Sequence, residues 1–225
     1  LPGLNFIAGL NGETERTYSM NLELLKELKS EGLWLRRINI RQVEGEVFQE
    51  IPESEFRRFK TTVREEIDRP MLEEIFPLGT KLKDLWWESR GGRIRLPEHL
   101  LEHKYRDPSK HGEPGITFGR QIGAYPILVG VPYAIPLESG SDIVVTGYGM
   151  RSISGIECGL DINHATKSQL QALPGIGDKA SWKIISNRAR RANRNQGSFS
   201  SVEEAFSEAG VAMPRLAPEV FVTTH

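Results

Sequence analysis

Two glycines flank an isoleucine in the stretch LPGIGD, residues 173–178, and basic residues follow it. Gly175 and Gly177 carry no Cβ, so each can adopt a positive φ or let another backbone come close. A helix opened by Asp178 would present unpaired N–H groups and the positive end of its dipole, which together attract an anion. These residues predict a phosphate-binding corner at Gly175–Gly177, with Ile176 anchoring the turn in the core.

Six basic residues and no acid lie between Asp178 and Glu203: Lys179, Lys183, Arg188, Arg190, Arg191 and Arg194. The whole chain has a formal net charge of −1, so this is a local segregation of charge that favours a polyanion. Asp178 itself favours the start of the helix but would repel a phosphate placed too near. The pattern predicts contact with a nucleic-acid backbone, DNA or RNA, without sequence readout. The alternative is a hairpin that only packs domains or binds protein.

The corner is expected to join two helices, the first capped by Asn163 or Thr166 and ending at Ala172. This segment resembles the helix-hairpin-helix DNA-binding motif, in the doubled form found in competence-protein DNA receptors. The matching residues are Asp161, Ile162, Asn163, Ala165, Leu170, Leu173, Pro174, Gly175, Ile176 and Gly177. The resemblance implies binding through the two glycines and nearby basic side chains. It continues to a second hairpin, where Gly210-Val211-Ala212 stands in place of a glycine pair and leaves a second phosphate site in doubt.

The first 43 residues predict a strand, a helix and a strand. Short apolar and alternating runs at 4–10 and 33–43 are typical of strands. Between them, Tyr18, Leu22, Leu25 and Leu28 recur at helical spacing, with Thr14 or Asn11 as N-cap and Gly32 as the stop. Two strands joined by a helix form a parallel βαβ unit by default.

This unit resembles the late part of the radical SAM barrel, in particular methylthiotransferases with a G-x-x-G-E-T turn, matched by Gly9 to Thr14. The strand RRINIRQ, residues 36–42, extends the resemblance to a group of radical SAM proteins that end in a helix-hairpin-helix. The resemblance covers nearly all of the chain. It implies that Gly9, Gly12 and Glu13 approach the cofactor or substrate, and that Asn39 and Arg41 point to the barrel lumen or its outer face. The alternative for the glycines is a plain β-to-α turn.

Radical SAM enzymes hold a [4Fe-4S] cluster on three cysteines, usually spaced C-x-x-x-C-x-x-C, and the cluster binds S-adenosylmethionine. This chain has one cysteine, Cys158, so we expect the cluster and S-adenosylmethionine in a full-length parent and no cofactor or metal here. The chain should therefore be inactive alone. Because it opens at Leu1-Pro2-Gly3 and runs straight into an apolar strand, we expect a missing part upstream.

The middle of the chain predicts two further segments. Residues 53–76 have one apolar helix face and are broken at Pro70 and Pro77, which indicates a helical connector. Residues 91–156 carry short β-prone runs between glycines and prolines, which are typical of a small antiparallel barrel or sheet. The second segment resembles the small TRAM barrel of methylthiotransferases, which implies RNA binding.

Two other patterns carry less weight. His99 to His103 match H-x-x-E-H, a zinc-binding pattern of metalloproteases. The surrounding sequence leaves little room for that scaffold and its third ligand, so a solvated helix face is favoured. Trp86 and Trp87 could stack on bases, although such a pair more often packs a seam between domains.

Composition bounds the remaining expectations. With one cysteine, no disulfide framework can form, which favours the cytoplasm, and no run approaches the roughly 20 apolar residues of a membrane span. We expect an α+β, multidomain fold: a partial α/β barrel (1–48), a connector (49–90), a small antiparallel β domain (91–156) and an all-α helix-hairpin-helix (157–225). The functional hypothesis is the non-cluster part of a radical SAM enzyme that binds nucleic acid. The rival is a binding or scaffold module without catalysis. The oligomeric state is left open.

Overall fold

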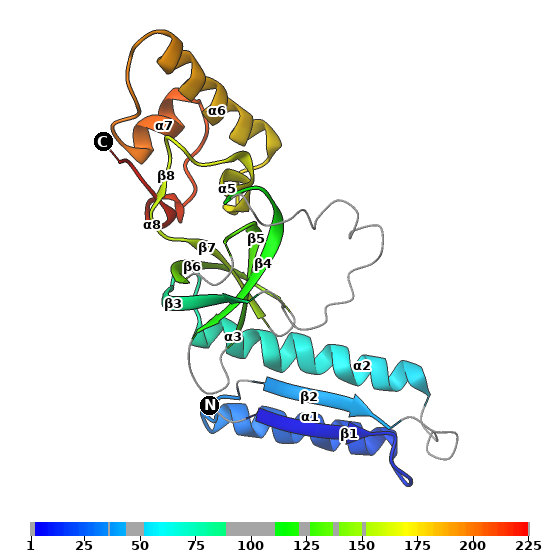
Figure 1. Ribbon diagram of the computed structural model, residues 1–225. Helices are drawn as coiled ribbons and strands as arrows, with labels where there is room; N and C mark the ends of the chain where they lie inside the picture. Colours follow the sequence, from blue (N-terminus) through cyan, green and yellow to red (C-terminus); the bar gives the residue numbers. More distant parts are fainter. Residues whose placement is uncertain are drawn as a thin grey trace. The chain divides into compact units, whose positions relative to one another are not determined.

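The computed structural model describes residues 3–35, 37–43, 52–88, 111–121, 127–136, 140–149 and 152–224. It is a mixed α and β structure that divides into two compact units, one of residues 1–77 with 148–151 and one of 78–147 with 152–225 (Figure 1). No helix in these described ranges is long and apolar enough to cross a membrane. The histidines of the H-x-x-E-H pattern, at 99 and 103, lie outside the described residues.

The first unit begins with the expected strand, helix and strand. β1 (Gly3–Ala8) and β2 (Arg37–Gln42) pair in parallel, from Gly3 opposite Arg37 to Ala8 opposite Gln42, and α1 (Glu15–Ser30) connects them. Thr14 is the N-cap of α1, and its N–H donates to Thr17 Oγ1 at 3.2 Å. Gly32 follows the helix with φ of +73°, the left-handed conformation that a glycine stop provides.

A long helical segment packs on this pair. α2 (Glu53–Val63) passes into a π-helical turn, η1 (Arg64–Asp68), and then α3 (Arg69–Ile75). The prediction of a break at Pro70 is wrong. A proline lacks the N–H for the ladder and its ring collides with the carbonyl four residues earlier. The π turn, in which the Arg69 N–H donates to Arg64 O, rearranges the ladder just before Pro70. The segment therefore continues to Ile75, two residues before Pro77.

One face of the two-stranded sheet is apolar and buried, and the other carries Asn5, Asn39 and the exposed Ile7. Ile38 and Ile40 are buried with Tyr18 and Phe59, whose rings stack at 4.9 Å between centroids. On the other face, Asn39 Nδ2 donates to Asn5 Oδ1 at 2.7 Å. This alternation is that of a sheet with helices on one side only.

The second unit contains a closed five-stranded barrel in the order β3-β4-β5-β7-β6. Its strands are β3 (Lys81–Glu88), β4 (Pro114–Gln121), β5 (Leu128–Tyr133), β6 (Gly140–Tyr148) and β7 (Ser152–Glu157). Inward-facing residues such as Leu85, Val129, Val131, Tyr133 and Ile143 are fully buried.

Two expectations about the barrel need correction. Residues 81–88 were expected in the connector, but they form β3, which pairs with both β4 and β6 and so closes the barrel. The barrel is also mixed and not purely antiparallel, since β5 and β7 run in parallel. Because β6 closes the barrel against β3, β7 returns beside β5. Trp86 and Trp87 belong to β3, and their side chains lie outside what the structure describes.

The C-terminal part of the second unit contains α5 (Lys167–Ala172), α6 (Asp178–Asn193), α7 (Val202–Glu208) and α8 (Ala217–Val220). It is not all-α, because β8 (Leu160–Asp161) pairs in parallel with β9 (Phe221–Val222). The Ile162 N–H continues this pairing by donating to Val222 O at 2.9 Å. The short strands tie the entry of the helical region to its exit.

The helical region contacts the barrel at several places. Lys81 of β3 pairs with Glu219 of α8 at 2.9 Å, and Thr166 reaches the residues just before β4. Thr166 Oγ1 donates to Gly112 O at 2.6 Å. Gly112 has φ of +79°, and a Cβ at this position would lie 2.7 Å from Thr166 Cγ2. Glycine is therefore needed at 112 for both conformation and space.

Candidate nucleic-acid interface

The corner at 173–177 is held by α5, which precedes it, and by hydrogen bonding within the turn. Thr166 is the N-cap of α5, as expected, accepting from the Gln169 N–H and completing a capping box. The Ile176 N–H donates to Leu173 O at 3.0 Å, and Gly175 has φ of +96°. Ile176 is 4% exposed, so it anchors the turn as predicted and its side chain does not reach the surface.

Gly177 differs from Gly175 in having an ordinary backbone. Its φ of −87° and ψ of −175° are extended, and a Cβ added to it would meet no atom within 4 Å. The residue is exposed and is the N-cap of α6, whose first ladder bond runs from the Ser181 N–H to Gly177 O. Within the described ranges, the N–H groups of Gly177, Asp178 and Lys179 have no acceptor. They form an open donor group at a helix N-terminus.

The negative charge of Asp178 is neutralised inside the hairpin. Lys167, at the start of α5, places its Nζ 2.6 Å from Asp178 Oδ1, and Gln171 donates to the same oxygen at 3.1 Å. The hydrogen bond from Lys167 holds the pKa of the Asp178 carboxyl below its usual range. The repulsion expected between Asp178 and a phosphate at the corner is therefore weakened by a partner on the preceding helix.

Three of the predicted basic residues are exposed along one face of α6. Lys179, Lys183 and Arg190 line an open hollow of about 550 Å³, together with Asp178, Trp182, Ser186, Asn187, Glu208 and Ala209. None of the three has an acidic partner within the part of the chain that the structure describes. Their charges are available to an external anion.

Arg188 is committed within the domain. Its Nη1 donates to Ile162 O at 3.2 Å and to Ala165 O at 3.0 Å, and the guanidinium is half-buried, which lowers its pKa. It holds the loop between β8 and α5 against α6. Arg188 is therefore a structural residue here, and the expectation that it faces nucleic acid receives no support from this placement.

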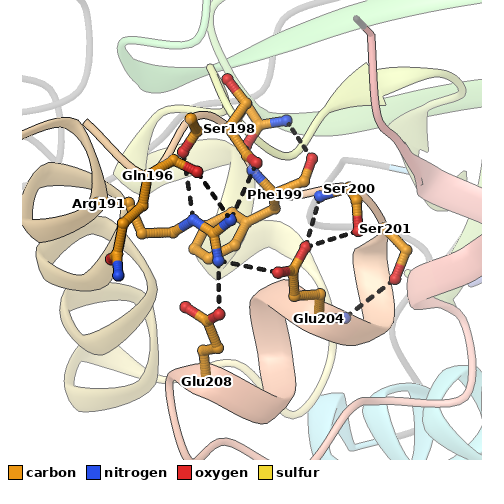
Figure 2. A network of polar contacts seen from close by, with 10 residues as sticks. Arg191, Gln196, Ser198, Phe199, Ser200, Ser201, Glu204 and Glu208 are labelled. Carbon is orange, nitrogen blue, oxygen red and sulfur yellow. Dashed lines mark hydrogen bonds and ion pairs between the residues drawn. The ribbon is translucent and has the colours of Figure 1, made fainter. Parts of the chain in front are cut away.

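Arg191 occupies the centre of a polar network (Figure 2). Its Nη1 lies 2.8 Å from Glu204 Oε1 and 2.5 Å from Glu208 Oε1, both on α7. Its other nitrogens donate to backbone carbonyls that include Gly197 O and Ser198 O, and the guanidinium lies 5.0 Å from the centroid of the Phe199 ring. Arg191 joins α6 to α7, and its guanidinium is engaged within the domain.

Asn163, which matches the helix-hairpin-helix motif, has a structural role. Its Oδ1 accepts from the Phe199 N–H at 2.8 Å, and its Nδ2 donates to Phe199 O at 3.2 Å. The side chain is 6% exposed and replaces a backbone partner for a segment 36 residues away. The amide therefore holds the entry of the first hairpin to the lead-in of the second.

Sequence reasoning missed Trp182. The indole is 51% exposed on the same face of α6 as Lys179 and Lys183. The sequence signal that could have pointed to this residue was a single tryptophan on a helix face whose other residues are basic or have small polar side chains. Lys167 Nζ lies 4.8 Å from the centroid of the indole, so Lys167 contacts both Asp178 and Trp182.

The second hairpin lacks the features of the first. Gly210, with φ of +57°, ends α7, and its N–H donates to Ser207 O at 3.0 Å. Ala212 stands where Gly177 stands in the first hairpin, and the helix that follows, α8, has four residues. We assign no phosphate site to Gly210.

Gly9, Gly12 and Glu13 form a closed turn at the carboxyl end of β1. Gly9 and Gly12 have φ of +85° and +83°, and the Gly9 N–H donates to Glu13 Oε2 at 2.7 Å. Glu13 is 9% exposed. The turn itself requires both glycines and one carboxylate oxygen, which supports the alternative of a plain β-to-α turn. The Glu13 carboxylate also takes a hydrogen bond from the Tyr18 hydroxyl, so it is engaged within the first unit.

The chain does not supply the ligands of an iron–sulfur cluster. Cys158 is its one cysteine, and it is half-buried, with a pKa raised by burial. Among the described residues, no three His, Cys, Asp or Glu side chains are grouped to hold a metal ion. Any cluster of a longer protein would therefore be held by residues outside this chain.

Comparison with known proteins yields relatives of much greater length. No family model matches the chain. An uncharacterized protein of Archaeoglobus fulgidus is 38% identical over 185 residues, which are 78% of this chain and 31% of that protein. An uncharacterized protein of Methanocaldococcus jannaschii is 37% identical over 166 residues, covering 69% of this chain and 27% of that protein. The chain spans less than a third of the length of these curated relatives.

Proposed function

We propose that the C-terminal helical region binds the sugar-phosphate backbone of nucleic acid without reading its sequence. The amides at Gly177, Asp178 and Lys179 receive a phosphate, and Lys179, Lys183 and Arg190 contact its neighbours. Arg188 and Arg191 support the binding surface from inside the domain. Such contacts give affinity that depends on salt and not on base sequence.

The observation that carries the proposal is the glycine at 177. Its backbone is extended and its surroundings are open, so the fold accepts a side chain at this position. Serine, aspartate or asparagine at the N-cap would satisfy one more helix N–H and stabilise α6. Glycine gives up this stabilisation and in return lets an external backbone approach the amides.

Electrostatics supports the same assignment. Asp178 is paired with Lys167, and Glu208, the other acid that lines the hollow, is paired with Arg191. The basic side chains on the exposed face of α6 are therefore opposed by no unpaired acid within the described part of the hollow. A protein with a formal net charge of −1 thus presents a locally cationic surface.

The proposal is tested by binding of the whole chain to a blunt DNA duplex and to an RNA duplex. Gly177→Val should lower the thermal unfolding midpoint only modestly, because valine is a poorer N-cap than glycine. It should weaken binding to all sequences alike, by roughly tenfold, which corresponds to about 1.4 kcal/mol. Ala212→Val, at the matching position of the second hairpin, is the control and should bind as the wild type does. Equal affinities for wild type and Gly177→Val would refute the phosphate role.

The wider proposal is that this chain is the non-cluster part of a radical SAM enzyme that acts on nucleic acid or is guided by it. The parallel βαβ unit, its polar Asn5–Asn39 face and the Gly9–Glu13 turn at the carboxyl end of β1 support it. Relatives more than three times the matched length leave room for a cluster-binding region. The closed Gly9–Glu13 turn equally supports a binding module without catalysis. Iron content and the absorbance spectrum of the full-length Archaeoglobus fulgidus relative, purified without oxygen, distinguish the two.

A further inference from the structure

We infer that the hollow beside Trp182 is a stacking site for an unpaired nucleobase, so that the preferred ligand is a duplex with a single-stranded extension. This inference rests on the proposed function and names the class of nucleic acid. Phosphates at the Gly177 corner position the strand, and the indole receives the first base that leaves the duplex.

The position of Trp182 fits this role. Half of the indole is exposed, although large aromatic side chains contribute most when they are buried. Trp182 lies five positions after Gly177 on a continuous helix, an axial distance of about 7.5 Å at the usual rise of 1.5 Å per residue. This is about two steps of a stacked strand, at about 3.4 Å per step. A strand bound at the corner therefore reaches the ring within two nucleotides.

The ring is held in place by its own hairpin. Lys167 lies over the indole and is fixed in turn by the ion pair with Asp178. Lys167 does not line the hollow, whereas Trp182, Lys179 and Lys183 do. The ring therefore has a cation on one side and open space toward the basic residues, which is how stacking platforms for single strands are built.

The other residues of the hollow match a nucleotide. Lys179 precedes Trp182 along α6 and Lys183 follows it, so the two can neutralise the phosphates on either side of the stacked base. Ser186 and Asn187 present a hydroxyl and an amide, which can bond the edge of any base. The one carboxylate at the far side, Glu208, is engaged by Arg191 and does not repel the strand.

The test compares three ligands on the whole chain: a blunt duplex, the same duplex with a short 3′ or 5′ extension, and a single strand. Wild type should prefer the extended duplex over the blunt one. Trp182→Ala should remove that preference, a loss of roughly 5- to 150-fold, and leave blunt-duplex affinity within about twofold. Trp182→Phe should restore most of the preference. Lys179→Gln is the charge control, and it should weaken all three ligands alike.

Several outcomes would overturn the inference. They are no preference for extensions in the wild type, a preference that survives Trp182→Ala, or an equal loss for blunt and extended duplexes. If the blunt duplex binds and is sensitive to Gly177→Val while extensions add nothing, only the stacking site fails. If no ligand binds at all, the proposed function fails as well. Loss of self-association in Trp182→Ala with unchanged nucleic-acid binding would assign the indole to a protein interface instead.

Discussion

Lys167 Nζ lies 2.6 Å from Asp178 Oδ1, across the turn that separates α5 from α6. This ion pair weakens the repulsion between Asp178 and an anion at the corner, because the only carboxylate on the turn already has a cation nearby. It also places a positive charge over Trp182. Lys167 of α5 therefore contacts both Asp178, at the phosphate corner, and Trp182, in the surface that we assign to nucleic acid.

Lys167→Met should weaken binding to a blunt duplex by about fivefold, because Asp178 is then unpaired beside the phosphate. Adding Asp178→Asn to this variant should recover most of the loss. Both side chains are exposed to solvent, so the free energy of unfolding should change little. Fluorescence anisotropy and thermal unfolding measure the two effects. An Asp178→Asn exchange that fails to rescue Lys167→Met would argue against the repulsion.

Asn163→Ala should destabilise the C-terminal helical region by about 1–3 kcal/mol, because the buried Phe199 N–H and C=O both lose their partner. Urea unfolding measures the loss of stability, and hydrogen exchange of the α6 and α7 amides shows whether it is local to this region. Ser186→Ala, an exposed change on α6, is the control. Unchanged protection in Asn163→Ala would mean that the side chain does not hold the two hairpins together.

Acid should open the C-terminal helical region before the rest of the second unit. The Ser200 N–H and hydroxyl, with Arg191, lower the pKa of Glu204 to about 2. For Asp161, burial raises the pKa, but hydrogen bonds from Thr224, His164 and Asn163 outweigh it and bring the pKa to about 2. Carboxyls with lowered pKa values stabilise the fold above their unfolded values of about 4, and this is lost as the pH falls toward 2. Glu204→Gln should therefore flatten the fall in unfolding midpoint between pH 5 and 2, and an unchanged slope would contradict this.

Alkali should weaken the end of the barrel that carries His111. His111 Nε2 lies 2.5 Å from Glu157 Oε2, and this hydrogen bond raises the pKa of His111. A raised pKa means that the stabilisation is complete below about pH 6.5 and is lost as the pH rises through the folded value. Wild type should unfold at a higher temperature than His111→Gln at pH 6 and at a similar temperature at pH 9. A difference that persists at pH 9 would show that charge is not its source.

Local signals predicted the parts of the fold that depend on near neighbours. The spacing of Tyr18 and Leu25 and the stop at Gly32 predicted α1, and the Thr166 cap and the buried Ile176 followed from the corner. The count of basic residues overestimated the charge available to nucleic acid. Arg191 is paired with Glu204 and Glu208, which lie 13 and 17 residues away. Sequence shows a charge but not its partner across a fold.

Other features depended on contacts that no local pattern contains. The break expected at Pro70 is absorbed by the π turn before it, and β3 becomes a strand because β4 and β6 provide partners on both sides. The sequence places Trp182 on a basic helix, but whether its indole is buried or exposed depends on the packing around α6, which no local pattern contains.

The most direct measurement of the central claim is an amide NMR titration of the whole chain with a blunt duplex. We predict that the N–H signals of Gly177, Asp178 and Lys179 shift progressively and saturate together, while the Gly210 signal stays in place. The shifts should reverse on adding salt, because added cations compete with the protein for the DNA phosphates and weaken these contacts. Duplex binding that moves other amides and leaves those of Gly177 and Asp178 unchanged would contradict the account.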